Sequence, residues 1–132
     1  MVNLLRFRAW HKTWEEMGKV KRIRFDDDGN VSTVLFMGKD FGVNSKIDEI
    51  ELMQSTGLHD KNGKEIFEKD ILDYNGRKVI VKWHGSYASF IYEFVDELQN
   101  RTVEWQPLYL SYYKFEVIGN SLENPELLEV TE

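Results

Sequence analysis

The chain has 132 residues, of which 42% are hydrophobic and 14% aromatic, a composition typical of a folded globular protein and not of a disordered one. Its formal net charge of -6 means that long-range electrostatics repel phosphate backbones, so nucleic-acid binding requires a local basic patch. The absence of cysteine excludes disulfides and thiol chemistry, and the lack of an apolar leader or membrane-spanning run favours a soluble cytoplasmic protein.

Short strands joined by polar turns are the pattern of the first half. Residues 3–10 alternate between apolar and polar side chains and predict a strand. Two more strands, 20–25 and 31–37, flank Asp26-Asp27-Asp28-Gly29-Asn30, whose Gly and Asn suit the positive φ angles of a tight hairpin. Residues 46–54 then predict a strand that pairs back onto this sheet.

The second half continues the same pattern. Asn75-Gly76-Arg77 lies between two apolar runs and predicts a second hairpin. Residues 88–95 have two partly apolar faces, as in a strand buried on both sides. The run 107–115 fits either a short helix or an extended segment, and we favour a short helix or turn. Pro125 at a first helical position, with Asn124 as its cap, predicts a helical turn over 125–128.

The stretch from Met53 to Leu72 predicts a strand, a compact crossing and a second strand. Its sequence, Met-Gln-Ser-Thr-Gly-Leu-His-Asp-Lys-Asn-Gly-Lys-Glu-Ile-Phe-Glu-Lys-Asp-Ile-Leu, resembles the central signature of the YopX family of small phage and prophage proteins. Phe7-Arg8-Ala9-Trp10 and the segment 117–128 agree with that family too. The resemblance implies a mainly β fold with an SH3-like barrel in the second half. It implies no activity, because the family has no established biochemical function.

One residue departs from the family pattern. Family members usually have Gly after the residue that corresponds to Glu68, whereas this chain has Lys69. Any tight turn at this point is therefore made differently or not at all.

Together these observations predict a mainly β fold. An N-terminal antiparallel β region, residues 1–45, is expected to pack on a C-terminal SH3-like β-barrel, residues 46–132, that ends in a short helical turn. One continuous compact domain over residues 1–132 is the alternative.

No motif for catalysis, metal binding or cofactor binding is evident. Residues 26–30 and 60–65 place carboxylates beside a glycine, but neither segment has an oxygen ligand at the first EF-hand position or Glu at the twelfth. Both segments therefore predict turns. The histidines at 11, 59 and 84 are far apart, and without cysteine they show no zinc-ligand spacing. We expect no enzymatic activity, no cofactor and no small-molecule substrate.

The aromatic run over residues 105–113 supplies the leading hypothesis about function. Part of it must belong to the core, and any exposed remainder would form a site for self-association or for a partner. The hypothesis is a non-enzymatic phage or prophage accessory protein that acts by protein binding or assembly, forms a homo-oligomer and contacts a host or phage protein. The candidate interface residues are Trp105, Tyr109, Tyr112 and Tyr113.

The alternative hypothesis is a nucleic-acid-binding accessory protein. Lys and Arg on paired N-terminal strands could hold phosphates, while Trp10 and Trp14 could stack on bases. A solvated face whose charges offset residues 26–28 or protect an edge strand explains the same residues, and we favour that explanation. The candidate phosphate-binding residues are Arg6, Arg8, Lys19, Lys21, Arg22 and Arg24.

Overall fold

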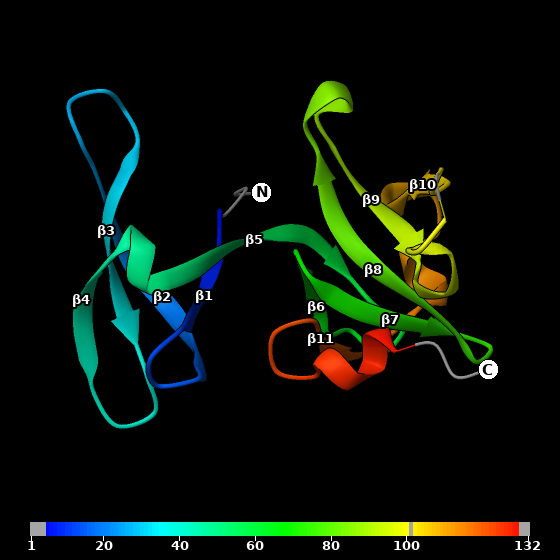
Figure 1. The fold of residues 1–132 in the computed structure, drawn as a ribbon, viewed down its shortest axis with the longest axis horizontal. Helices are drawn as coiled ribbons and strands as arrows, with labels where there is room; N and C mark the ends of the chain where they lie inside the picture. The colour runs from blue at the N-terminus through cyan, green and yellow to red at the C-terminus, as the bar shows by residue number, and fades with distance from the viewer. Residues whose placement is uncertain (1–4, 101, 130–132) are drawn as a thin grey trace. The chain divides into compact units, whose positions relative to one another are not determined.

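The computed structural model describes residues 5–100 and 102–129 (Figure 1). Antiparallel strands and short 3-10 turns make up this part of the chain, which confirms the mainly β prediction. One compact unit runs to Gln54 and a second begins at Ser55. The predicted boundary after residue 45 falls near the end of β4, before the last strand of the first unit.

The first unit is a meander of four strands followed by a returning fifth strand. Its strand order is β4-β3-β2-β1-β5, because η1 carries the chain across so that β5 pairs with β1 through His11 and Ile50. Alternate side chains point inward and form a core that includes Ala9, Val34 and Phe36. The elements are β1 (Phe7–His11), β2 (Glu16–Phe25), β3 (Val31–Met37), β4 (Gly42–Lys46), η1 (Ile47–Glu49) and the first half of β5 (Ile50–His59).

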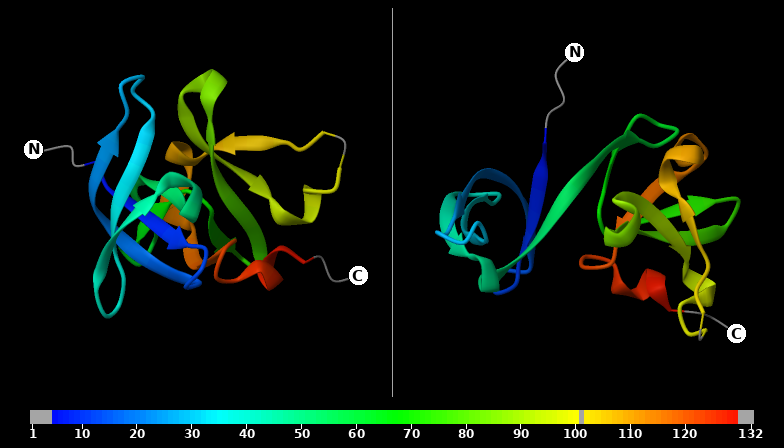
Figure 2. Two further views of the ribbon diagram at one scale, coloured as in Figure 1. Left: turned by 60° about the vertical axis from the view of Figure 1, so that its left-hand side comes forward. Right: turned by 90° about the horizontal axis from the view of Figure 1, so that it is seen from above.

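The second unit repeats this strand order. Its sheet runs β10-β9-β8-β7-β11, and 3-10 turns again lead into the last strand, which pairs with the first strand of the meander (Figure 1, Figure 2). Among the described residues no pairing joins the edge strands β10 and β11, so closure into an SH3-like barrel stays a prediction. The elements after β5 are β6 (Glu65–Phe67), β7 (Asp70–Tyr74), β8 (Arg77–His84), η2 (Gly85–Tyr87), β9 (Ser89–Phe94), η3 (Val95–Glu97), β10 (Trp105–Pro107), η4 (Leu108–Leu110), η5 (Tyr112–Lys114), β11 (Glu116–Asn120) and η6 (Pro125–Leu128).

Three local predictions for the second unit are confirmed and one is wrong. Asn75 and Gly76 take φ angles of 52° and 87° in the turn between β7 and β8. The run 107–115 forms the turns η4 and η5, and η6 lies at the expected position. The Asn124 side chain does not cap η6, because its Oδ1 accepts the Asn120 N–H at 3.2 Å instead.

The predicted second strand of the family signature is divided at Lys69. This residue has φ 69° in a turn between β6 and β7, so the turn is made with lysine in the left-handed conformation that glycine adopts most easily. The buried Asp70 carboxylate supports the turn by accepting the Phe67 N–H at 2.8 Å. The Lys69 N–H donates to Val81 at 2.9 Å, which ties the turn to β8.

Two turns of the same design occur, one in each unit. Asp26 and Asp60 each accept two backbone N–H bonds through Oδ1, from the residues two and four positions later, at 2.8–2.9 Å. Gly29 and Gly63 occupy the same place and share a φ of 83°. The side-chain bonds explain the carboxylates beside glycine, as expected of turns.

Asp60 differs from Asp26 in one long-range bond. Its Oδ2 accepts the N–H of Val117 in β11 at 2.8 Å, while Asp26 stays at the surface. Burial of Asp60, which is 6% exposed, tends to raise its pKa, but the three backbone N–H bonds and nearby Lys64 outweigh burial and lower it. The charged carboxylate is therefore a stabilising link between the turn and β11.

Candidate binding surfaces

Three aromatic rings gather beside the tip of the β8–β9 hairpin, where Figure 1 shows the η2 turn. The centroids of His84 and Tyr87 lie 4.9 Å apart, and Trp105 from β10 lies 4.9 Å and 5.0 Å from them. Strand pairing places β8, β9 and β10 in one sheet, but Trp105 aligns with Glu93 and Ile80, so its side chain leans along the sheet toward the hairpin tip. We call these three residues the aromatic trio. Its rings contact one another and leave no slot for a ligand between them.

Further aromatic side chains of the second unit reach solvent. Trp83 is 48% exposed and packs edge-on over Phe90 across the hairpin, with ring centroids 5.0 Å apart. Tyr109 in η4 is 60% exposed and Tyr113 in η5 is 56% exposed. Large apolar side chains at these exposures are the kind that protein interfaces use.

The structure divides the predicted interface residues between surface and core. Tyr109 and Tyr113 are exposed, whereas Tyr112 is half-buried and packs against the core of the second unit. Tyr112 and Tyr113 meet edge to face at 5.6 Å. Trp105 is half-buried and belongs to the aromatic trio, and within the described chain no ring contact joins it to Tyr109, Tyr112 or Tyr113.

Sequence analysis missed the hairpin tip. The tip carries Trp83, His84 and Tyr87, of which Tyr87 is 66% exposed. The available signal was Gly85 followed by serine between aromatic residues, a turn-prone pair that presents its neighbours at a hairpin end.

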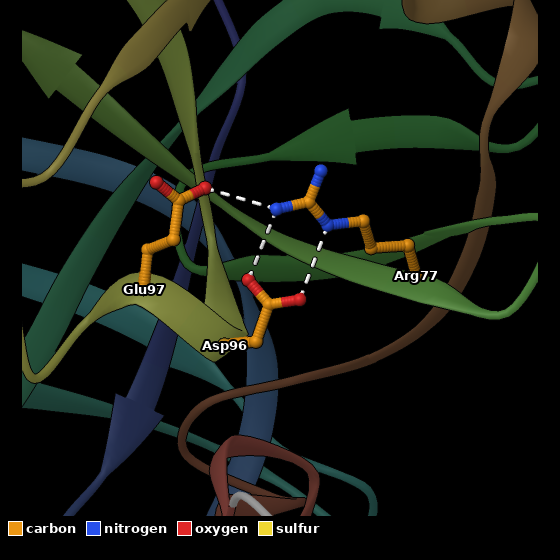
Figure 3. A network of polar contacts seen from close by, with 3 residues as sticks. All are labelled: Arg77, Asp96 and Glu97. Atoms are coloured by element: carbon orange, nitrogen blue, oxygen red, sulfur yellow. Dashed lines mark hydrogen bonds and ion pairs between the residues drawn. The ribbon is translucent and has the colours of Figure 1, made fainter.

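A polar network at the other end of β8 is fully engaged (Figure 3). Arg77 binds Asp96 with two bonds of 3.1 Å, reaches Glu97 at 3.0 Å and lies 3.6 Å over the Phe94 ring. The hydrogen bond to Asp96 raises the pKa of Arg77, and the same bond lowers the pKa of Asp96. Arg77 lines an open hollow of about 370 Å³, but its charge is already matched by two carboxylates. The network is therefore a surface clamp between β8 and η3.

The candidate phosphate-binding residues of β2 share one face of the first sheet. In a regular strand Lys19 and Lys21 would point opposite to Arg22 and Arg24. A β-bulge between Val20 and Arg22 removes this conflict, because it inserts Lys21 as an extra residue. Val20 pairs with Phe36 and packs inward, and the four basic side chains are exposed on the outer side.

The other two predicted members of the basic set are Arg6, which lies outside the strands, and Arg8, which is the cross-strand neighbour of Lys19. Arg6 precedes β1 and is exposed, whereas Arg8 lies within β1 and is half-buried. Trp10 is half-buried and shares the outer side of β1 with Arg8. Trp14 lies elsewhere, where its ring stacks on the buried His11 ring with centroids 4.2 Å apart.

Within residues 5–100 and 102–129, no three histidine or carboxylate side chains come together as possible ligands of a metal ion. Over the same residues, no helix has the length and apolar content needed to cross a membrane.

The structure defines a mainly β protein of two antiparallel sheet units with exposed aromatic and basic surfaces. The chain belongs to the YopX family, whose model, described as YopX protein, matches residues 6–129. This match confirms the resemblance seen in the sequence. The solved structure of protein EF1440 from Enterococcus faecalis is similar, with a TM-score of 0.68 and 31% identity over 97% of this chain and 100% of that one. Among curated proteins, no sequence matches the chain.

Proposed function

We propose that the protein is a non-enzymatic accessory protein of phage or prophage that acts by protein binding, and that it first assembles with itself. The observation that carries this proposal is the exposure of Tyr109 and Tyr113 on consecutive 3-10 turns. Leu110, between them, is 59% exposed and adds aliphatic surface. Three large side chains at the surface within five residues form an apolar patch, a feature that marks association sites on soluble proteins.

The fold supports such a role because it presents this patch rigidly. Leu108 is fully buried beneath η4, and the Ser111 hydroxyl donates to the Tyr92 hydroxyl at 3.2 Å. These contacts hold both turns against β9. A preorganised patch loses little entropy when it binds, which favours affinity.

We further propose that the second unit closes as an SH3-like barrel. Its strand order supports this, since a four-strand meander is followed by 3-10 turns and a fifth strand paired with the first. Core residues from β7, β8 and β9 pack with Leu108 and Phe115 in one cluster, as expected of a sheet that curls around its own core.

Self-association is tested by light scattering coupled to size-exclusion chromatography over a range of protein concentrations. The test variant replaces Tyr109 and Tyr113 by Ser. Replacement of Phe25, which is 63% exposed in the first unit, by Ser serves as the matched loss of an exposed aromatic ring. We expect an oligomer of the wild-type chain and of the control, and an assembly weakened about 30-fold or more in the test variant, since interface hot spots contribute about 2 kcal/mol or more.

Two outcomes would overturn the proposal. A wild-type chain that stays monomeric at every concentration would remove assembly. An oligomer that survives the double tyrosine change as well as the Phe25 change would show that the patch is not its interface.

A further inference from the structure

The charged side chains on the outer side of β2, β3 and β4 are all basic. Strand register places Arg24, Thr33 and Lys46 in one row across the three strands, so Lys46 joins the set that β2 supplies. The Arg22 side chain reaches across β3 to the middle of β4, where its Nη2 donates to Asn44 Oδ1 at 3.5 Å. We call this surface the basic face, and its cations are Lys19, Lys21, Arg22, Arg24 and Lys46.

One carboxylate lies beside the basic face, because Glu49 accepts the backbone N–H of Lys46 at 2.9 Å. Across the described part of the chain, however, none of the five side-chain cations forms an ion pair. Asp26, at the end of the hairpin, uses Oδ1 for its own turn amides. The outward positions of β2, β3 and β4 include no carboxylate. A face that merely offset the acidic hairpin tip would pair with it, and this one does not.

The bulge in β2 is what concentrates the charge. Without it, two of the four β2 cations would point into the core beside Phe36, which no folded sheet tolerates. With it, Val20 and Ile23 fill the core while Lys21 and Arg22 project side by side. Bulges often occur where a strand must re-aim side chains next to a functional site.

We propose that the basic face binds the phosphate backbone of single-stranded nucleic acid. The β2 cations extend from Lys19 to Arg24, about 17 Å along the strand. This length suits a nucleic-acid strand, which carries one phosphate charge on each nucleotide. Arg22 and Arg24 supply planar guanidinium groups that match phosphate oxygens and stack on bases.

The apolar side chains of β3 favour single-stranded over double-stranded nucleic acid. Leu35 and Met37 are half-buried on the outer side of β3, between the cations of β2 and the edge strand β4. Unpaired bases can lay their apolar faces on such side chains, whereas a duplex hides its base faces and presents phosphates. This binding concerns the first unit and is separate from the tyrosine patch of the second.

The net charge of the chain does not oppose this binding at the basic face. Residues 1–54 contain nine basic and nine acidic side chains, so the excess negative charge belongs to residues 55–132. The carboxylates nearest to the basic face lie at its ends, where residues 26–28 follow Arg24 and Glu49 contacts Lys46. The local field at its centre is set mainly by Lys19, Lys21 and Arg22, since exposed charges beyond about 8–10 Å are screened at physiological salt.

The test is fluorescence anisotropy with a labelled oligothymidylate, a duplex of equal length and polyglutamate as an acidic polypeptide. The test variant is R22Q/R24Q, and the matched control is K12Q/K39Q, which removes the same charge from exposed loop residues of the same unit. K46Q is a third variant that tests the residue added by strand register. Circular dichroism melting checks that each variant is folded.

We expect salt-dependent binding of the oligothymidylate by the full chain. The two arginine changes should weaken binding about tenfold and reduce the slope of log K against log salt by about 1.4, because each single-strand contact contributes about 0.7. K46Q should weaken binding in the same direction, and the loop control should leave it unchanged.

Three results would overturn the inference. The first is no binding of oligothymidylate at low salt. The second is that K12Q/K39Q weakens oligothymidylate binding as much as R22Q/R24Q does, which would show that only the net charge of the protein matters. The third is binding of duplex or polyglutamate as tight as that of oligothymidylate, which would assign the face to another partner class.

Discussion

Removal of the charge on Asp60 should destabilise the second unit far more than the same change at Asp26 destabilises the first. Both residues hold a turn through two backbone N–H bonds, so Asp26→Asn is an internal control for Asp60→Asn. The difference is the bond from the Val117 N–H to Asp60 Oδ2. An asparagine that keeps its oxygen on the turn must point its amide N–H₂ at the Val117 N–H, which leaves two donors facing each other.

The size of the effect follows from this geometry. An unsatisfied buried N–H costs about 1–3 kcal/mol, and exchange of a charged acceptor for a neutral one weakens the two turn bonds further. Asp60→Asn should therefore lower the free energy of unfolding by about 2–4 kcal/mol. Asp26 is exposed and its amide replacement can still accept both turn bonds, so its change should cost less than about 1 kcal/mol.

Hydrogen exchange measured by mass spectrometry is the assay, because peptides report on each unit separately. Asp60→Asn should speed exchange across β7 to β11 and leave the peptides of β2 and β3 unchanged. Asp60 has a lowered pKa when folded, so its stabilisation is present above the unfolded pKa near 3.9 and is lost as the pH falls through the folded pKa. Equal effects of the two variants, or an acid sensitivity that Asp60→Asn leaves unaltered, would refute this reasoning.

Three further changes test the fold. Lys69→Gly should raise the free energy of unfolding by about 0.5–1 kcal/mol in urea titration, because relief of the left-handed φ outweighs the entropy of glycine. Gly18→Ala should lower the melting temperature by the equivalent of about 1–3 kcal/mol, since its Cβ would lie 2.6 Å from the Phe36 ring; an unchanged melt would contradict this close approach. Arg77→Gln should lower the melting temperature at low salt and less at high salt, because its partners are exposed carboxylates; a salt-independent loss would point to its stacking on Phe94.

Local turn chemistry made much of the fold predictable. Asn75-Gly76, Asp28-Gly29 and Asn62-Gly63 fix where strands end, since few residues accept the positive φ that such turns require. The family's usual glycine marked the position of Lys69 as a possible turn, but the turn itself was not predictable, because lysine rarely adopts that conformation and only the buried Asp70 shows what holds it.

The binding surfaces were less predictable than the turns, for a reason of register. Trp105 meets His84 and Tyr87 because β9 joins β8 and β10 in one sheet and the Trp105 side chain leans toward the hairpin tip, and no spacing along the chain encodes that contact. In the same way, the sequence contains the basic residues of β2 but does not show whether they share a face. The bulge beside Val20 decides it.

The two units share a strand order and a turn design, yet they present opposite chemistry. Residues 55–132 have fourteen acidic and eight basic side chains, so their long-range field repels phosphates, and their exposed side chains at η4 and η5 are apolar. The first unit has balanced charge and concentrates its cations on one face. Salt therefore separates the two proposed activities: it should weaken binding at the basic face while leaving assembly through Tyr109 and Tyr113 intact, because apolar burial is not screened by ions. Nucleic-acid binding and assembly should therefore be measured together across a salt series. Different salt dependences indicate two independent surfaces, whereas a shared dependence indicates one charged surface that serves both activities.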